Sequence, residues 1–164
     1  MNNPQIAALL RLQAYETWAN DRALASLDTV PVDMRTRPSF TRAAQLLPHS
    51  TLARTIWLMR LRGVKHEIPK EWFPNWTTEE TRRQMSTVDA QWREFLGSLT
   101  DADTERVITY HSSEGVRYES SVHDICTHVF HHSAYHRGQV ARLVSESGGQ
   151  RASTDYIIFT RVQK

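Results

Sequence analysis

Apolar residues recur every three or four positions in four long segments of the chain, which is the spacing of amphipathic helices. In the first segment, Asn3 and Pro4 form a helix start signal, with asparagine as N-cap and proline at the first helical position. The apolar spacing continues to near Leu27, and the polar, proline-bearing stretch 28–38 follows. The first helix is therefore predicted to end before a linker.

A second helix is predicted to begin at Ser39 or Thr41 and to end at Arg62. Gly63 follows directly, and glycine is the residue that most often terminates a helix. Pro48 lies inside the segment, where it removes a backbone donor, so it should kink the helix or shift its start. The inner face of this helix is predicted to carry Leu46, His49, Ala53, Ile56 and Arg60.

Thr77 and Glu80 form a capping box at the start of a third helix, whose apolar spacing continues to Leu99. Between the second and third helices, residues 64–76 contain two prolines and no helical spacing, so a loop is predicted there. We expect its aromatic side chains to pack against the helices rather than remain free. These aromatics are Trp72, Phe73 and Trp76.

The pattern changes in residues 104–119, where short β-branched and aromatic runs flank a glycine-containing turn. This segment is predicted to be a small hairpin or an extended excursion. Ser121 and Asp124 then cap a fourth helix, which stops at the two glycines 148–149. The apolar tail 156–159 is predicted to dock on the core.

Four long amphipathic segments favour one arrangement, an all-α four-helix bundle formed by a single domain over residues 1–164. Both connections that flank the third helix are long. Helices that are neighbours in sequence therefore need not be antiparallel.

Two histidines lie on the predicted buried face of the fourth helix. The residues of that face follow at steps of three and four, and they are Val122, Ile125, Val129, His132, His136, Gln139 and Leu143. Imidazoles are costly to bury without partners, and side chains four residues apart on a helix can reach one point. The pair His132 and His136 therefore predicts a site for a divalent metal ion.

His49, on the inner face of the second helix, is the predicted third ligand. Three histidine nitrogens would leave one coordination position open, as in catalytic rather than structural metal sites. His128, one turn before His132, is the main rival as a ligand, whereas His131 points away from the buried face. Gln139 has two possible roles, a hydrogen bond to a ligand ring or a bridge to another helix.

Composition narrows the classes of function. The 164 residues carry a net charge of +2 with scattered basic residues, which gives no case for nucleic-acid binding. No apolar run is long enough to cross a membrane, and the first residues lack a signal-peptide pattern. Cys126 is the only cysteine, which we interpret as a small core residue. The chain is therefore predicted to be cytoplasmic.

Several short motifs resemble the DinB-like superfamily of bacterial metalloproteins. They are Trp18-Ala19-Asn20, His49 with Trp57, the His-x-x-x-His-Arg-Gly-Gln-Val run at 132–140, and the stretch from Gly149 to Thr154-Asp155-Tyr156. Trp18 and Trp57 are themselves interpreted as core aromatics. The chain departs from the pattern at Arg54, where many relatives carry an acidic residue, and at Pro48, directly before His49.

The resemblance implies an up-down-down-up bundle that forms a homodimer and binds one divalent ion through His49, His132 and His136. Zinc or nickel is the expected ion, with iron and manganese as alternatives. Characterised relatives are thiol-dependent transferases or isomerases, so the resemblance also implies a small-molecule partner such as a low-molecular-weight thiol.

Two classes of function follow. A divalent ion with an open position lowers the pKa of a bound water from 15.7 to roughly 7 and deprotonates a bound thiol, which predicts a metal-dependent transferase or hydrolase with no further catalytic side chain. The alternative is a non-catalytic metal-binding or stress-response protein whose ion is structural or sensory. A fourth protein ligand such as His128 would favour the second class.

Overall fold

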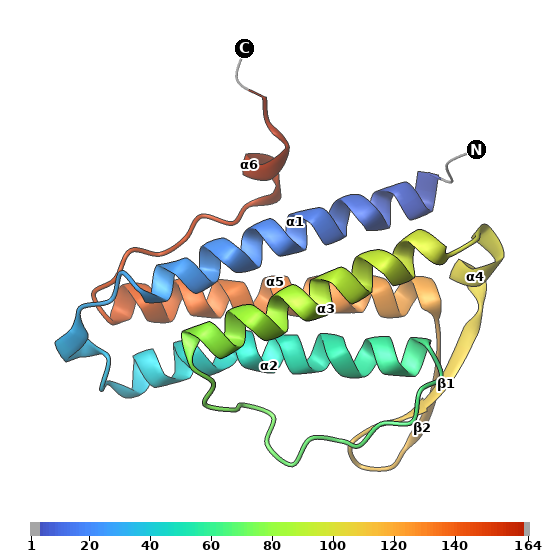
Figure 1. Ribbon diagram of the computed structural model, residues 1–164, viewed down its shortest axis with the longest axis horizontal. Coiled ribbons are helices and arrows are strands. Elements are labelled where there is room, and N and C mark those ends of the chain that lie inside the picture. Colours follow the sequence, from blue (N-terminus) through green and yellow to red (C-terminus); the bar gives the residue numbers. More distant parts are fainter. Residues whose placement is uncertain (1–3, 163–164) are drawn as a thin grey trace.

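The computed structural model describes residues 4–162, and most of them are helical, which is consistent with the all-α prediction (Figure 1). The elements in chain order are α1 (Pro4–Leu27), a 3-10 turn (Val32–Met34), α2 (Pro38–Leu61), α3 (Thr78–Ser98), α4 (Asp101–Glu105), β1 (Val107–His111), β2 (Arg117–Ser121), α5 (Val122–Glu146) and α6 (Tyr156–Thr160). Within residues 4–162, none of the helices is both long and apolar enough to cross a membrane.

The four long helices lie side by side. Helix α2 packs against α5 and α3, and α1 packs against the same two helices from the other side. In Figure 1, α2 and α3 run in one direction, whereas α1 and α5 run in the opposite direction. Helices α2 and α3 are parallel because the connection 62–77 returns along the length of the molecule before α3 begins.

Local signals place most helix ends where the sequence predicts them. The Ser121 hydroxyl accepts a hydrogen bond from the Asp124 backbone N–H at 3.0 Å, as expected for the cap of α5. The Thr77 hydroxyl accepts one from the Glu80 backbone N–H at 3.1 Å. The Glu80 carboxylate, however, accepts from Gln84 at 2.7 Å instead of completing a capping box. The expected N-cap of α1, Asn3, lies outside the described residues.

Helix α2 corrects one prediction. It begins at Pro38, ahead of both Ser39 and Thr41, because Arg37 is extended (ψ 145°), as a residue before proline prefers, and proline fits the first turn. The helix continues through Pro48, which is buried, so this proline does not shift the start.

The predicted hairpin is present. Strands β1 and β2 pair antiparallel, from Val107 opposite Ser121 to His111 opposite Arg117. Gly115 in the turn has a φ of 82°, which only glycine adopts readily. The short helix α4 before the hairpin, where Thr100 and Asp103 form a capping box, was not predicted.

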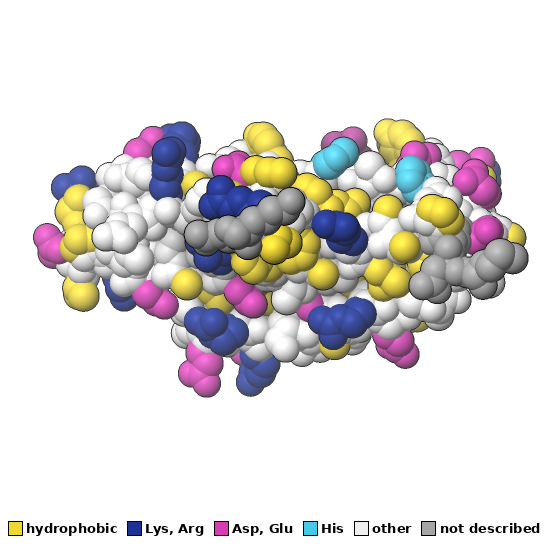
Figure 2. All heavy atoms as spheres, turned by 90° about the horizontal axis from the view of Figure 1, so that it is seen from above, with side chains coloured by type: hydrophobic (Ala, Val, Ile, Leu, Met, Phe, Trp, Pro, Cys, Tyr) yellow, Lys and Arg dark blue, Asp and Glu magenta, His cyan; other side chains and the backbone are white. Residues whose placement is uncertain are grey.

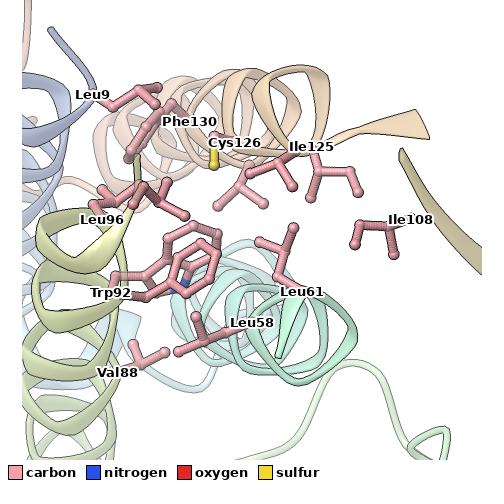
Figure 3. Packing of buried hydrophobic residues seen from close by; sticks show 14 residues of the cluster. Leu9, Leu58, Leu61, Val88, Trp92, Leu96, Ile108, Ile125, Cys126 and Phe130 are labelled. Carbon is pink, nitrogen blue, oxygen red and sulfur yellow. The ribbon is translucent and has the colours of Figure 1, made fainter. Parts of the chain in front are cut away.

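The apolar core consists of two clusters at different levels along the helices. In the first, Trp92 of α3 is fully buried among Leu58 and Leu61 of α2 and the first turns of α5 (Figure 3). Cys126 belongs to this cluster, and burial raises the pKa of its thiol to about 12, as expected for an inert core residue. The second cluster lies at the other end of the helices and includes Leu24, Ala43, Leu46, Leu47 and Val140.

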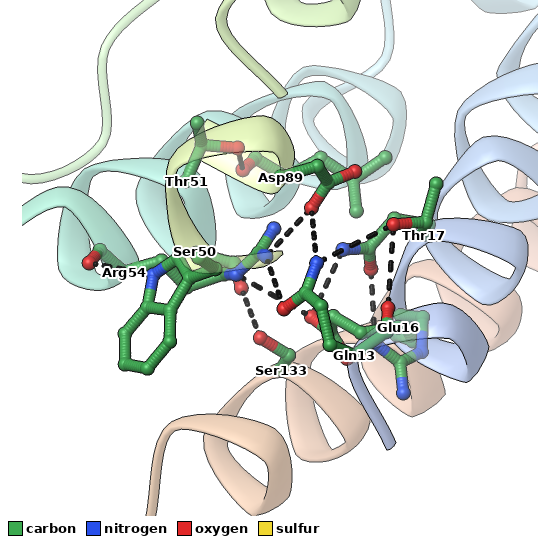
Figure 4. A network of polar contacts seen from close by, with 12 residues as sticks. Gln13, Glu16, Thr17, Ser50, Thr51, Arg54, Asp89 and Ser133 are labelled. Atoms are coloured by element: carbon green, nitrogen blue, oxygen red, sulfur yellow. Dashed lines mark hydrogen bonds and ion pairs between the residues drawn. The ribbon is translucent and has the colours of Figure 1, made fainter. Parts of the chain in front are cut away.

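A layer of buried polar side chains lies between the two clusters (Figure 4). Arg137 Nη1 donates to Glu16 Oε2 at 2.6 Å and to Asn20 Oδ1 at 2.9 Å. Arg54 Nη2 lies 2.6 Å from Asp89 Oδ1 and donates to Gln13 Oε1 at 3.2 Å. Two guanidinium groups thus face two carboxylates in the interior, and the layer is neutral overall.

The C-terminal segment α6 lies on the outer surface of α1 and not on the core. Tyr156 and Phe159 contact Tyr15, with ring centroids 5.1 and 5.8 Å away, and Phe159 also contacts Trp18. Figure 2 looks onto this face and shows hydrophobic side chains around the C-terminal segment. The docking prediction is wrong in its target, since α6 has no buried residue and contacts Tyr15 and Trp18 of α1 instead. Trp18, predicted in the core, is half-buried beneath α6.

We predict that Glu16→Gln lowers the free energy of unfolding by about 3–5 kcal/mol, because it leaves the buried Arg137 guanidinium without a charged partner. Urea unfolding followed by circular dichroism measures the change. The control is Glu94→Gln, which removes the partner of Arg62 in an exposed pair and should change stability by less than about 1 kcal/mol. Equal effects of the two substitutions would contradict the central role of the Glu16 carboxylate.

Candidate metal centre

Three histidines meet at the level of the polar layer, at the junction of α2 and α5. One nitrogen from each of His49, His132 and His136 lies within 4.8 Å of the others. The Nε2 atoms of His132 and His136 are 3.2 Å apart. Ligand nitrogens about 2.0–2.1 Å from a tetrahedral zinc ion are separated by about 3.3 Å, so this pair already has a suitable spacing. The structure brings together the three residues that the sequence singled out.

The predicted buried face of α5 is confirmed at most of its positions, and the buried residues are Val122, Ile125, Val129, His136 and Leu143. His132 and Gln139 instead lie half-buried at its edge, and Ser133 and Arg137 are buried beside them. A strict three-four alternation has a period of 3.5, whereas a straight helix has 3.6 residues per turn, so the true face drifts around the helix. His132 therefore borders the core, whereas His136, at 8% exposure, belongs to it.

Hydrogen bonds from the outer ring nitrogens orient two of the three rings. His49 Nδ1 lies 2.9 Å from the Trp72 carbonyl oxygen, and His136 Nδ1 lies 3.2 Å from Gln139 Oε1. Because both oxygens can only accept, each Nδ1 carries the proton and each Nε2 keeps its lone pair. This is the arrangement of metal-binding histidines, whose second nitrogen donates to a carbonyl or carboxylate. Of the two roles open to Gln139, the structure contains the contact to the ligand ring.

The connection 62–77 supplies contacts that the sequence did not assign to the site. The Phe73 ring stacks on His49, with centroids 4.2 Å apart and an interplanar angle of 17°. The Arg42 guanidinium lies over the Phe73 ring, 3.8 Å from its centroid. The aromatic residues before α3 indicate that this loop packs against the helices. Their spacing in the sequence does not identify His49 as the residue that they contact.

Electrostatics keep the imidazoles neutral. Burial, followed by the charges of His136, His49 and His128, lowers the pKa of His132 to about 4. Burial also lowers the pKa of His49 and of His136. Only the neutral ring has a free lone pair, so all three side chains are competent ligands at neutral pH.

A cavity of about 420 Å³ opens beside His49 and His132. His128 lines this cavity, with its ring centroid 5.6 Å from that of His132, and it is not part of the group of converging nitrogens. The prediction of His128 as a rival ligand is therefore not supported by the geometry. Trp57, interpreted from the sequence as a core residue, is half-buried and forms part of the cavity wall, because it lies on the edge of α2 that faces the hairpin.

The residues next to the histidines tie them to the polar layer. The hydroxyls of Ser50 and Ser133 are 3.0 Å apart and link the turns of α2 and α5 that carry His49 and His132 (Figure 4). Arg137, which follows His136, pairs with Glu16. Arg54, the departure from the family pattern, is held by Asp89 within the same layer and does not line the cavity.

Comparison with curated proteins finds no match. The profile of the DinB family, in contrast, matches residues 1–164, the entire sequence. This match agrees with the order of the motifs and with the convergence of the three histidines. The chain belongs to the DinB family.

Proposed function

We propose that this protein binds one divalent metal ion through His49, His132 and His136 and acts as a metal-dependent enzyme on a small molecule. The observation that carries the proposal is the convergence of three neutral imidazoles at the wall of a cavity. Three nitrogen ligands with two rings fixed by outer hydrogen bonds suit zinc or nickel. The protein fold in this proposal is an up-down-down-up four-helix bundle.

An ion with an open position supplies a nucleophile at neutral pH, either from a bound water or from a bound thiol. The chain contributes the orientation of the ligands and a cavity with aromatic walls beside them. Trp57 and Trp72 form parts of its wall. Thiol transfer or hydrolysis is the reaction class that fits, and a homodimer in the cytoplasm is the setting that the family resemblance supports.

We predict that purified protein carries about one divalent ion per chain and that His132→Ala abolishes this stoichiometric binding. Elemental analysis after gel filtration measures the content. His131→Ala is the matched control, because the neighbouring His131 is exposed and lies outside the cluster. Loss of the metal from both variants would contradict the assignment of ligands.

The metal-free protein should become less stable as the pH falls from about 6.5 to about 4. The pKa of His132 is about 4 in the folded protein against a usual value of 6.5, so the unfolded chain binds the proton first. The free energy of unfolding should decrease by roughly 1–2 kcal/mol over this window after allowance for partial exposure. Urea titrations at several pH values measure this dependence. The free energy of unfolding should change less with pH in His132→Gln than in the unmodified protein, whereas His131→Gln should leave its pH dependence unchanged.

The catalytic proposal requires an open coordination position. Cobalt-substituted protein should therefore show a visible spectrum that changes when 2-mercaptoethanol or azide is added, since a new donor alters the ligand field. His128→Ala should respond in the same way. A spectrum that responds only after removal of His128 would reveal a closed four-histidine site and favour a structural or sensory ion.

A further inference from the structure

We propose that the cavity beside the three histidines selects a small organic anion, whose carboxylate or equivalent group binds to Arg60. The inference deepens the proposed function, because it names the class of ligand that this site accepts. It rests on the charges that surround the cavity and on the way in which Arg60 is held.

The charges around the cavity are of one sign. None of the described residues that line it is Asp or Glu, and Arg60 is its one arginine or lysine. Arg60, Tyr110 and Ser112 also line an adjoining cavity of about 460 Å³ between β1 and the start of the connection 62–77. That second cavity adds Lys65, again without a carboxylate among its described lining residues. A ligand that spans both spaces therefore meets only cationic and neutral side chains.

Arg60 is fixed in position without an ion pair. Its guanidinium lies 4.6 Å from the ring centroid of Trp57 and 5.2 Å from that of Tyr110. Nη2 donates one hydrogen bond, at 2.8 Å, to the His111 carbonyl oxygen. Within residues 4–162, no carboxylate lies within ion-pair distance of Arg60. The side chain is thus oriented by aromatic contacts, and donors of its planar fork remain for a ligand.

Arg60 is half-buried, so its charge is partly desolvated, and this burial lowers the pKa of the guanidinium. The two arginines of the polar layer differ in this respect, because Arg54 and Arg137 each have a carboxylate at 2.6 Å. A partly desolvated guanidinium without such a partner has a favourable interaction to gain from an anion.

Arg42 adds positive charge on the far side of the histidine cluster, where its guanidinium lies over the Phe73 ring that stacks on His49. The buried Glu16 carboxylate at the same level of the helices is paired with Arg137 at 2.6 Å. Together with the aromatic walls, this field suits an anion with a flat or apolar body. The aromatic wall residues are Trp57, Trp72, Tyr110 and Tyr118.

The first test needs no metal. Benzoate and benzamide have the same shape and differ in charge, and tryptophan fluorescence reports binding because Trp57 and Trp72 line the cavity. Metal-free protein should bind benzoate at least about tenfold more tightly than benzamide, the effect of one charge-assisted contact. Arg60→Gln should remove the preference, and Arg60→Lys should retain part of it. Arg62→Gln is the matched control, since Arg62 is exposed and lines neither cavity.

The second test uses cobalt-loaded protein with 3-mercaptopropionate and its methyl ester. The acid should change the visible spectrum at a concentration at least about tenfold lower than the ester does. In Arg60→Gln, the acid and the ester should act at similar concentrations. Equal responses to acid and ester would overturn the anion preference and leave the open metal site intact. No response to either thiol would instead refute the open site, while the benzoate titration would still decide the role of Arg60. Equal binding of benzoate and benzamide overturns the inference.

Discussion

The carboxylate of Glu16 determines the position of the helix turns that carry the histidines. It accepts a hydrogen bond from Arg137 at 2.6 Å and is also hydrogen-bonded by Ser133. These two residues directly follow His136 and His132 in α5. Burial alone would raise the pKa of Glu16, but the charges of Arg137 and Arg54 and these hydrogen bonds lower it. One ionised side chain of α1 therefore contacts both turns of α5 that carry His132 and His136.

The same layer of charges gives the helices a defined register. If the interior were purely apolar, helices shifted or rotated relative to one another would differ little in energy. Buried charges remove this freedom, because each one must lie next to its partner. Arg54 of α2 lies between Asp89 of α3 and Gln13 of α1. Arg137 of α5 pairs with Glu16, so each of the four long helices contributes to the layer. Buried ion pairs add little net stability compared with apolar packing, and conformational specificity is their better-attested role. In this protein the three converging histidines lie at the same level along the helices as this layer.

The sequence predicts the helices and the three histidines well, because caps and apolar spacing are local signals and a helix places residues i and i+4 on one face. It misplaces only part of the buried face of α5, because the half-buried His132 and Gln139 fit the same steps of three and four as their buried neighbours. The buried roles of Arg54 and Arg137 also escape it, because arginine is usually exposed and only three-dimensional packing supplies Asp89 and Glu16. The contacts of Trp72 and the position of α6 depend on segments with no periodic pattern.

The two halves of the candidate site differ in how they are held. His132 and His136 lie on consecutive turns of one continuous helix, so their separation is set by helix geometry. The ring of His49 is instead oriented by a loop, through the Trp72 carbonyl and the stacked Phe73. Trp72 also belongs to the cavity wall, so the residue whose carbonyl oxygen orients the His49 ring contributes to the cavity as well.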